Sequence, residues 1–519
     1  MTIPRTLERA ARLWPEAPAI EDGGEVLSFR ALAARAEAAA RAFLAAGVAH
    51  GDRIGIWAPN GARWVEAALG LQSVGAILVT LNTRFKAPEA AYVLRKSGAR
   101  LLCTVGDFLE TNYADAIAGE DLPGLEQVLL LEGESPHARP WPAFVGDGDG
   151  IPAEQARQRA ADVAPADLSD FLFTSGTTGK PKAVMTAHGQ NLKVFDVWGR
   201  SVGLRAGDRY LIVNPFFHSF GYKAGWLACL IHGATALPHR VFSPESVLGR
   251  VQADRVTVLP GAPALYQSLL AFEGRERFDT SSLRLAVTGA APTPVELVRR
   301  MRDDLGFRDV IKAYGLTESC GTVSACQLGD DLERIAHSDG CAIPDTEVRC
   351  VDDTGREVPR GTPGEVRVRG YNVMRGYFDD PEETARAIDA DGWLHTGDVG
   401  VMDEDGYLRI TDRIKDMFIM GGFNVYPAEV ENALFQHPDV AAVAVIGVPD
   451  ERMGEVGMAF VVPAPGARPD GAELIAWSRE RMANYKVPRY VDVVESLPTN
   501  ASGKVLKTDL RQRIAGRFD

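Results

Sequence analysis

Apolar runs of strand length alternate with helix-patterned segments over most of the chain, up to about residue 400. This alternation is typical of layered α/β structure, in which helices cover the faces of a buried sheet. The segment 28–47 shows the helical part clearly, since Ser28 is placed to cap a helix, apolar residues recur on one side, and Gly47 is placed to end it. The predicted fold class is therefore α/β, built in layers.

Three later segments are typical of buried strands that end in a Pro or Gly turn. They cover residues 209–218, 255–263 and 283–291. Loops at the carboxyl ends of such strands are the usual ligand-binding positions of α/β sheets. We therefore expect a binding site where these strands end.

The length of the chain predicts more than one domain. A chain of 519 residues is too long for a single hydrophobic core, which favours two or three domains. Near residue 400 the pattern changes to a charged segment, a Gly-Gly turn and enough strands and helices for a compact domain of about 100 residues. We expect a large N-terminal domain of layered α/β subdomains at 1–411, a hinge at 412–416, and a small, mobile α+β domain at 417–519.

Composition excludes several partners. A formal net charge of -14 argues against a nucleic-acid partner, because phosphate backbones are bound through clustered Lys and Arg. No apolar run reaches the roughly 18 residues of a membrane span, so we expect no stable membrane insertion. The six cysteines have no metal-binding spacing and are expected to be free thiols in a reducing cytoplasm.

The segment FLFTSGTTGKPKAV, residues 171–184, combines glycines, hydroxyl side chains and lysines after an apolar strand. Glycines let backbone N–H groups close on an anion, and lysines add positive charge, so the composition favours a polyphosphate. The spacing is not that of a Walker A loop, because only two residues separate Gly176 from Gly179. An ordinary Ser/Gly/Thr surface turn has a similar composition. The candidate phosphate-binding residues are Thr174, Ser175, Gly176, Thr177, Thr178, Gly179 and Lys180.

Three other segments carry side chains suited to a nucleotide. In AYGLTES, Glu318 is a hard oxygen ligand for Mg²⁺ and Thr317 can bond a phosphate oxygen, although a Thr-Glu pair also begins many helices. Asp398 follows a glycine in a turn, where a carboxylate can accept both hydroxyls of a ribose, although ordinary Asp turns look the same. Lys504 follows a Ser-Gly turn and can act as a mobile point charge, although most such lysines are surface residues.

Taken together, these segments stand in a characteristic order. The order is TSGTTGKPK, YGLTE, TGD, DRIKD, GGFNVYPAEVE and ASGK, and it covers nearly the whole chain. It resembles the adenylate-forming superfamily of acyl-CoA synthetases, adenylation domains and beetle luciferases. The resemblance implies a large N-terminal domain that binds ATP and an acid, and a small C-terminal domain that swings between two orientations.

The resemblance also implies a reaction in two halves. A carboxylate first attacks the α-phosphate of ATP, which releases pyrophosphate and leaves an acyl-adenylate, and the thiol of coenzyme A then displaces AMP. The implied cofactors and co-substrates are ATP, Mg²⁺ and coenzyme A, with a small carboxylic acid as the partner and a homo-oligomer left open. Developing phosphoryl charge has to be stabilised by positioned groups, which suits this residue set.

Roles for single residues follow from the same resemblance. The loop would hold the β and γ phosphates, Thr317 would bond a phosphate, and Glu318 with Thr178 would serve Mg²⁺. Asp398 would take the ribose hydroxyls, with Arg413 nearby. The residues expected to border the adenine are Gly289, Ala290, Ala291, Lys312, Ala313 and Tyr314.

The C-terminal residues would act in turn. Lys504 would bridge the carboxylate and the α-phosphate during adenylation, and Lys415 in DRIKD would be the hinge. After rotation, Gly421 and Gly422 would let the pantetheine of coenzyme A pass close to backbone. One departure is that several relatives carry lysines where this chain has Ile419 and Gly421.

The acid pocket is expected near residues 214–230. His218 would close on the acid, with Phe220 and Gly315 beside it, although a buried structural histidine fits the same position. Lys223 lies in an apolar run, where a charge is expensive unless it is paired or reaches solvent, and a keto group on the acid would give it a partner.

Three stretches, PFFHSFGYKAG, AVTGAAPTPVELV and KDMFIMGGFNVYPAEVE, resemble bacterial CoA ligases for the bicyclic propanoate left from steroid C and D rings. The alternatives are a medium- or long-chain fatty acyl-CoA synthetase, an adenylation enzyme that loads a carrier protein, and a non-catalytic nucleotide-binding protein.

Overall fold

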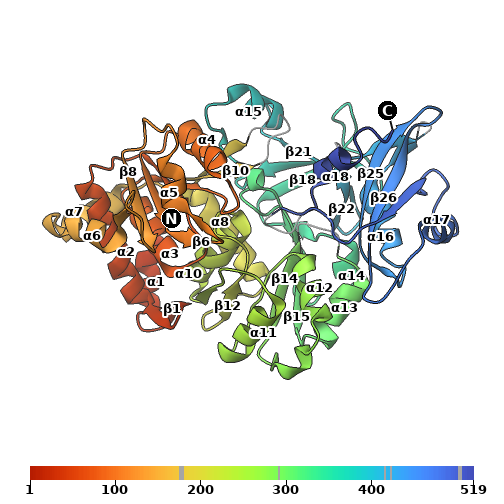
Figure 1. Cartoon of the computed structure of the whole chain (residues 1–519). Helices are drawn as coiled ribbons and strands as arrows, with labels where there is room; N and C mark the ends of the chain where they lie inside the picture. Colours follow the sequence, from red (N-terminus) through yellow and green to blue (C-terminus); the bar gives the residue numbers. More distant parts are fainter. Residues whose placement is uncertain (175–180, 290–292, 414–415, 421–422, 501–504, 519) are drawn as a thin grey trace.

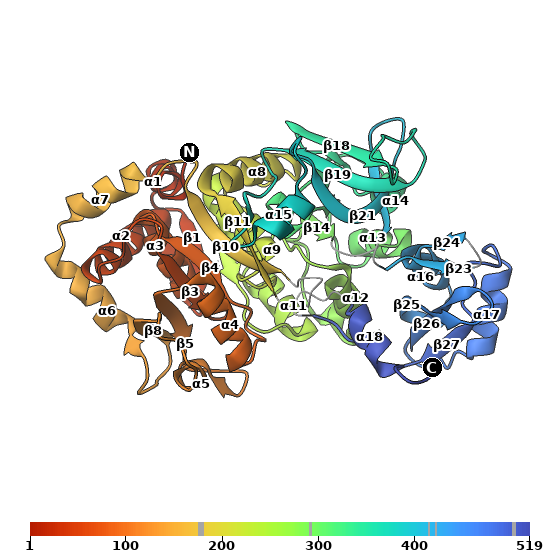
Figure 2. The ribbon, with the colours of Figure 1, turned by 90° about the horizontal axis from the view of Figure 1, so that it is seen from above.

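The computed structural model describes residues 1–174, 181–289, 293–413, 416–420, 423–500 and 505–518. The chain from α1 (Ile3–Leu13) to β22 (Leu408–Arg413) forms one large body, and the following residues form a smaller body at one end of it, drawn in blue in Figures 1 and 2. No helix among the described residues is both long and apolar enough to cross a bilayer.

An eight-stranded sheet lies at the centre of the N-terminal part, in the order β20-β11-β10-β4-β3-β5-β8-β9. The strands are β3 (Arg53–Trp57), β4 (Ile77–Thr80), β5 (Leu101–Val105), β8 (Gln127–Glu132), β9 (Arg139–Pro140), β10 (Leu168–Thr174), β11 (Lys182–Ala187) and β20 (Gly376–Tyr377). The strands from β10 to β8 in this order are parallel and mostly buried, as expected of a sheet covered on both faces. β10 and β11 instead form an antiparallel hairpin.

Helices cover this sheet, and α2 (Phe29–Ala45) begins where the sequence predicts. Ser28 Oγ accepts a hydrogen bond from the Ala31 N–H at 3.1 Å, which caps the helix. Gly47 follows the last turn with φ +71, a conformation that glycine adopts without strain. Other helices of the large body are α3 (Ala62–Ser73), α4 (Ala87–Ser97), α8 (His188–Ser201), α10 (Ala228–His232), α11 (Pro244–Ala253), α12 (Pro263–Ala271), α13 (Val295–Asp303), α14 (Leu332–His337) and α15 (Pro381–Ala387).

Two four-stranded sheets are joined by single bridges at Val258, in the orders β12-β13-β1-β2 and β14-β15-β16-β17. Their strands are β1 (Pro18–Asp22), β2 (Glu25–Ser28), β12 (Arg209–Ile212), β13 (Thr235–Pro238), β14 (Leu285–Gly289), β15 (Asp309–Tyr314), β16 (Ser324–Ala325) and β17 (Cys341–Ala342). The predicted strands at 209–218 and 283–291 are confirmed as β12 and β14. The predicted strand at 255–263 forms only the bridges at Val258, since Pro260 lacks the N–H that a longer ladder needs and Pro263 already begins α12.

A fourth sheet closes the large body, in the order β18-β19-β21-β22. Its other strands are β18 (Thr346–Val351), β19 (Gly364–Gly370) and β21 (Leu394–Met402), and all its pairs are antiparallel. It has a small apolar core of its own, in which Val366 and Leu394 are buried. This sheet carries Asp398 toward β15.

The small body has a separate hydrophobic core that includes Phe418, Val445 and Leu510. Its sheet runs β24-β23-β26-β25, with β27 beside β26. The elements are β23 (Phe418–Met420), β24 (Phe423–Val425), α16 (Pro427–Leu434), β25 (Val440–Asp450), β26 (Gly454–Pro463), α17 (Gly471–Arg479), β27 (Tyr490–Val493) and α18 (Lys507–Arg513). β22 ends at Arg413, so the predicted hinge, 412–416, begins within the last strand of the large body, and Lys415 lies outside the described residues.

Candidate active site

The hairpin of β10 and β11 positions the candidate phosphate loop. Thr174 at the end of β10 pairs with Lys182 at the start of β11, so residues 175–181 connect two strands that are held side by side. Lys182 Nζ forms an ion pair with Glu383 of α15 and lies 5.0 Å from the centroid of the Tyr377 ring. Lys182, where the candidate phosphate loop meets β11, is therefore held against the segment around β20.

Glu318 lies on a short turn, Thr317–Ser319, that follows β15. Its Oε1 accepts a hydrogen bond from the Tyr377 hydroxyl at 3.0 Å, and its backbone carbonyl accepts one from the Met374 N–H at 2.8 Å. Burial, and then the negative charge of Glu318, raise the pKa of Tyr377 well above its ordinary value, so the phenol stays a donor at neutral pH. The tyrosine thus orients a half-buried carboxylate, and Lys182 lies over the same ring.

Asp398 on β21 reaches the end of β15 across the boundary between two sheets. Its Oδ2 accepts a hydrogen bond from the Tyr314 hydroxyl at 2.6 Å, and only 3% of the residue is exposed. The Asp398 N–H donates to Thr396 Oγ1 at 3.1 Å, which fixes the backbone. Arg413 stands opposite Asp398 in the ladder of β21 and β22. The structure therefore brings Tyr314, Asp398 and the backbone of Arg413 together, and their roles at the nucleotide stay predictions.

The ends of β14 and β15 approach each other closely. Gly289 pairs with Ala313, and a Cβ on Gly289 would lie 2.3 Å from the Ala313 carbonyl oxygen, so only glycine fits there. Lys312 does not contribute its charge to this edge, because its Nζ pairs with Asp339 Oδ1 at 3.1 Å and only 5% of the residue is exposed. That Lys312 borders the adenine stays a prediction, and the charge of its side chain is balanced inside the chain by Asp339.

The loop after β12 carries the candidate acid-pocket residues. His218 caps the short helix α9 (Ser219–Gly221), and its Nδ1 accepts a hydrogen bond from the Phe220 N–H at 3.2 Å. Both rings are half-buried. Gly315, after β15, is exposed, and a Cβ there would lie 2.3 Å from the Gly321 carbonyl oxygen. The assignment of these residues to the acid pocket stays a prediction.

Asn60 holds this loop and was missed by the sequence reasoning. Its Nδ2 donates to the carbonyl oxygens of Ile212, Asn214 and His239 at 3.1, 3.0 and 3.1 Å. Its Oδ1 accepts from the Phe216 N–H at 2.8 Å. A buried amide that satisfies four backbone groups fixes the path of the loop toward His218. The signal available in the sequence was an Asn after a strand and a Pro, in WAPN, which usually marks only a turn.

Lys223 is fully buried and has a partner within the chain. Its Nζ lies 3.0 Å from Asp170 Oδ1 and donates to Thr186 Oγ1 at 2.9 Å, and both side chains of the ion pair are 0% exposed. The expectation that Lys223 needs a keto group on the acid as its partner is therefore wrong, because Asp170 and Thr186 fill that role. The alternative in which it reaches solvent at the pocket rim is wrong for the same reason.

Part of the predicted site lies outside the residues that the structure describes. The predicted residues that lie outside the described ranges are Ser175, Gly176, Thr177, Thr178, Gly179, Lys180, Ala290, Ala291, Lys415, Gly421, Gly422 and Lys504. The polar contacts near the expected hinge are described: the Ala428 N–H donates to Asp412 Oδ2 at 2.9 Å, and Arg511 lies 3.5 Å from Asp416 Oδ1. Among the residues that can be placed, no group of three or more His, Cys, Asp or Glu could hold a metal ion.

Two family models match this arrangement. The model described as AMP-binding enzyme covers residues 7–378, and the model described as AMP-binding enzyme C-terminal domain covers residues 429–504. The chain belongs to the family of AMP-binding enzymes and has the adenylate-forming fold, with a large N-terminal and a small C-terminal domain.

Individual relatives indicate which kind of AMP-binding enzyme the chain is. The chain is 48% identical over 517 residues, 98% of each chain, to the 3-[(3aS,4S,7aS)-7a-methyl-1,5-dioxo-octahydro-1H-inden-4-yl]propanoyl:CoA ligase of Rhodococcus jostii (strain RHA1). It is 48% identical over 511 residues to the ligase of the same name from Mycobacterium tuberculosis (strain ATCC 25618 / H37Rv), again covering 98% of each chain. The crystal structure of the anthranilate CoA ligase AuaEII with anthranoyl-AMP is similar, with a TM-score of 0.91 and 30% identity over 99% of this chain and 97% of that one. The protein is an acyl-CoA ligase, and the prediction made from its motifs is confirmed.

Proposed function

We propose that the protein activates a bulky alicyclic propanoate of the dioxo-indane type and converts it to its CoA thioester. One observation carries this proposal: two ligases named for that acid are 48% identical to the chain over 98% of its length. The identity extends through both domains, so it includes the region after β12 where we place the acid. Medium- and long-chain fatty acids are the competing substrates.

In the first half-reaction, the acid's carboxylate oxygen bonds to the α-phosphorus and pyrophosphate leaves. The loop that starts at Thr174 holds the β and γ phosphates, and Lys504 neutralises charge on the reacting oxygens. Asp398 receives the ribose hydroxyls, with Tyr314 fixing its orientation. Because phosphoryl transfer depends on position and charge stabilisation, a carboxylate locked by a 2.6 Å hydrogen bond supports this role.

Magnesium fits the site through Glu318. A carboxylate is the hard oxygen donor that Mg²⁺ prefers, and Tyr377 contacts both this carboxylate and Lys182, at one end of the phosphate loop. A single protein carboxylate is compatible with this ion, because Mg²⁺ commonly binds one or two carboxylates and takes its remaining ligands from water and substrate phosphates. When bound, the ion would offset the negative charge of the phosphates, and Glu318 with Thr178 would hold it.

In the second half-reaction, the thiol of coenzyme A bonds to the acyl carbon and AMP leaves. Rotation at Lys415 withdraws Lys504 and brings Gly421 and Gly422 to the pantetheine path. The small domain has a closed core and touches the preceding strand through polar contacts, which supports its movement as one body.

The test compares three acids in a pyrophosphate-release assay. The first is the 7a-methyl-1,5-dioxo-octahydro-indenyl propanoate, the second is the same bicyclic acid without its keto groups, and the third is octanoate. We expect the highest kcat/KM for the dioxo acid, and the second acid isolates the contribution of the keto oxygens. Equal or better turnover of octanoate would contradict the proposed substrate while leaving the ligase class intact.

A second measurement concerns the acceptor. AMP formation is measured with acid alone, with acid plus coenzyme A, and with neither. Rapid AMP release only in the presence of both is the expected result. An adenylate that persists despite coenzyme A would point to a carrier protein or another acceptor instead.

A further inference from the structure

A closed polar cluster lies between the β10–β11 hairpin and the segment after His218. Each of its members is 0% exposed, and they are Gln72, Ser169, Asp170, Thr186, Asn191, Tyr222 and Lys223. Buried polar groups constrain geometry more strictly than apolar contacts, because each requires partners at hydrogen-bond distance. The cluster therefore fixes how its elements sit relative to one another.

On the hairpin side, Asp170 and Thr186 stand directly opposite each other in the ladder. Thr186 Oγ1 donates to Asp170 Oδ1 at 2.7 Å, and Asn191 Nδ2 from α8 donates to Asp170 Oδ2 at 2.6 Å. Thr174 and Lys182, which border the phosphate loop, belong to the same pair of strands and pair in the same ladder. The contacts that position Asp170 and Thr186 therefore also position Thr174 and Lys182, at the two ends of the loop.

On the side of the cluster opposite the hairpin, the consecutive residues Tyr222 and Lys223 both contact the Asp170 carboxylate. Lys223 Nζ lies 3.0 Å from Asp170 Oδ1, and the Tyr222 hydroxyl lies 3.5 Å from Asp170 Oδ2. They begin a π-helical turn, Tyr222–Leu227, whose Gly225 is not helical, with φ -90 and ψ -108. Such turns are rare and cluster at functional sites. This turn follows directly on the helix that His218 caps.

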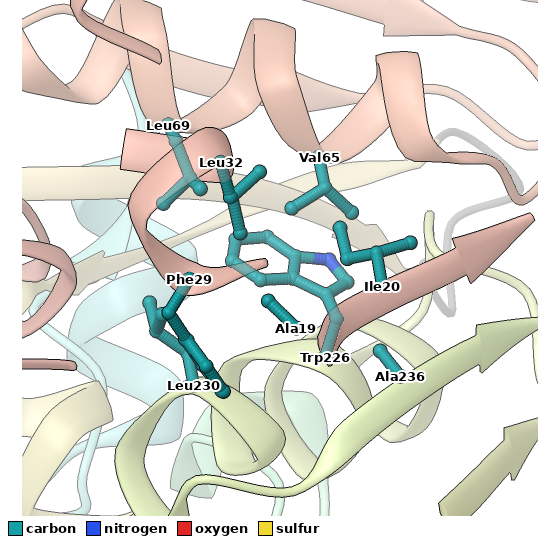
Figure 3. Close-up of a pocket in the computed structure, with 9 residues that line it drawn as sticks. All are labelled: Ala19, Ile20, Phe29, Leu32, Val65, Leu69, Trp226, Leu230 and Ala236. Atoms are coloured by element: carbon teal, nitrogen blue, oxygen red, sulfur yellow. The ribbon is translucent and has the colours of Figure 1, made fainter. Parts of the chain in front are cut away.

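The opposite side of the turn is held by apolar packing. Trp226 stacks on Tyr222 with ring centroids 4.9 Å apart, and Figure 3 shows its indole between Leu32, Val65 and Ile20. The turn is thereby held between the apolar side chains around Trp226 and the buried Asp170 carboxylate. Movement of Asp170 would have to move the turn, and with it the chain that leads back to His218.

We propose that the Lys223–Asp170 pair positions the acid-side segment against the phosphate loop, so that the carboxylate and the α-phosphate of ATP meet in line. The proposal rests on the proposed roles of the loop and of His218. Lys223 and Asp170 are positioning residues, since both are sealed from any substrate. Their effect falls on adenylation, which needs acid and pyrophosphate to be held together. Thioester formation starts after pyrophosphate has left, so it does not depend on this alignment.

The test separates alignment from folding by removing both charges at once. Lys223→Met alone leaves a buried carboxylate unpaired and is expected to lower the Tm clearly, whereas Lys223→Met combined with Asp170→Asn restores much of it. In the double variant, we expect pyrophosphate release to fall about 10- to 100-fold, as misalignment near 1 Å can cause. Thioester formation from supplied acyl-adenylate should stay within about twofold of wild type.

A matched control is the internal ion pair of Asp208, directly before β12, and Arg284, directly before β14. Arg284→Met with Asp208→Asn removes an internal pair at the opposite ends of these strands. We expect any loss there to affect both half-reactions equally. Normal adenylation in the Lys223/Asp170 double variant, or an equal loss in both half-reactions, would overturn the proposal.

A milder pair of variants covers the case in which the double variant does not fold. Thr186→Val keeps the shape but removes the hydroxyl that joins Lys223 to Asp170, and Thr186→Ser retains it. We expect a selective loss of adenylation in the Val variant and recovery in the Ser variant; equal behaviour of the two would overturn the proposal. All ratios are taken with an acid that the wild type turns over, so an incorrect substrate would show in the wild type and not in these ratios.

Discussion

Tyr314 and Asp398 connect two sheets of the large body through a hydrogen bond of 2.6 Å. The tyrosine ends β15, whereas the aspartate belongs to β21 of the fourth sheet, so the bond fixes the carboxylate where the two sheets meet. A ribose bound by Asp398 would therefore be positioned by a contact from the strand whose end is proposed to border the adenine.

Tyr314→Phe should weaken nucleotide binding without unfolding the domain. Losing a hydrogen bond to a charged group costs about 1.5–3 kcal/mol, which corresponds to roughly a 10- to 100-fold higher Kd for AMP. Isothermal titration measures this directly. Tyr407→Phe is the matched control, because Tyr407 donates to Asp330 Oδ1 at 2.8 Å outside the proposed nucleotide site. A similar loss in both variants would contradict the role of Tyr314.

Glu318→Gln should impair adenylation by about 100-fold or more, because an amide oxygen neither carries the charge nor binds Mg²⁺ as a carboxylate does. Tyr377→Phe keeps the carboxylate but releases its orientation, so we expect only a several-fold higher Mg²⁺ concentration for half-maximal rate. Rates are measured against free Mg²⁺ at saturating acid. The exposed Glu333→Gln on α14 serves as control, and an unchanged Mg²⁺ dependence in Glu318→Gln would rule out the metal role.

Lys504→Ala should abolish the first half-reaction and largely spare the second. Removing a positioned cation from developing phosphoryl charge costs on the order of 10²- to 10³-fold in rate. Pyrophosphate release and thioester formation from supplied acyl-adenylate are measured separately. Lys507→Ala is the neighbouring control, since Lys507 pairs with Glu431 at 2.8 Å within the small domain. If adenylation survives in Lys504→Ala, the assigned role is wrong.

Stability should fall as the pH drops from about 6.5 to about 4, in part through His188. Desolvation lowers the pKa of this fully buried histidine to about 4. In that window the unfolded state binds a proton that the folded state does not, so each pH unit costs about 1.4 kcal/mol. His188→Gln should flatten the dependence of Tm on pH in this range. The exposed His137→Gln should leave it unchanged, and identical slopes in all three proteins would exclude His188.

The candidate nucleotide residues could be named from the sequence because they lie in short motifs, and their roles stay predictions. Thr174 ends β10 and Glu318 stands on a turn after β15, whereas Asp398 lies inside β21 and not in the turn that its preceding glycine predicts. The family and the layered fold follow from the same local patterns. The order of the motifs then relates sites that are far apart in the chain.

The partners of single buried charges could not be predicted in this way. A lysine in an apolar run signals that Lys223 needs a counter-charge, but nothing local relates it to Asp170 at the start of another strand. The same holds for Lys312 and Asp339, and for Asn60 and the loop it holds. These contacts depend on how sheets pack together, which periodicity along the chain does not specify.

The separate core of the small domain has a consequence for how such a ligase can change over time. Because none of the described residues of that core belongs to the large domain, replacing or rotating the small domain would not require the core of the large domain to repack. The part proposed to deliver Lys504 could therefore change independently of the part proposed to select the acid.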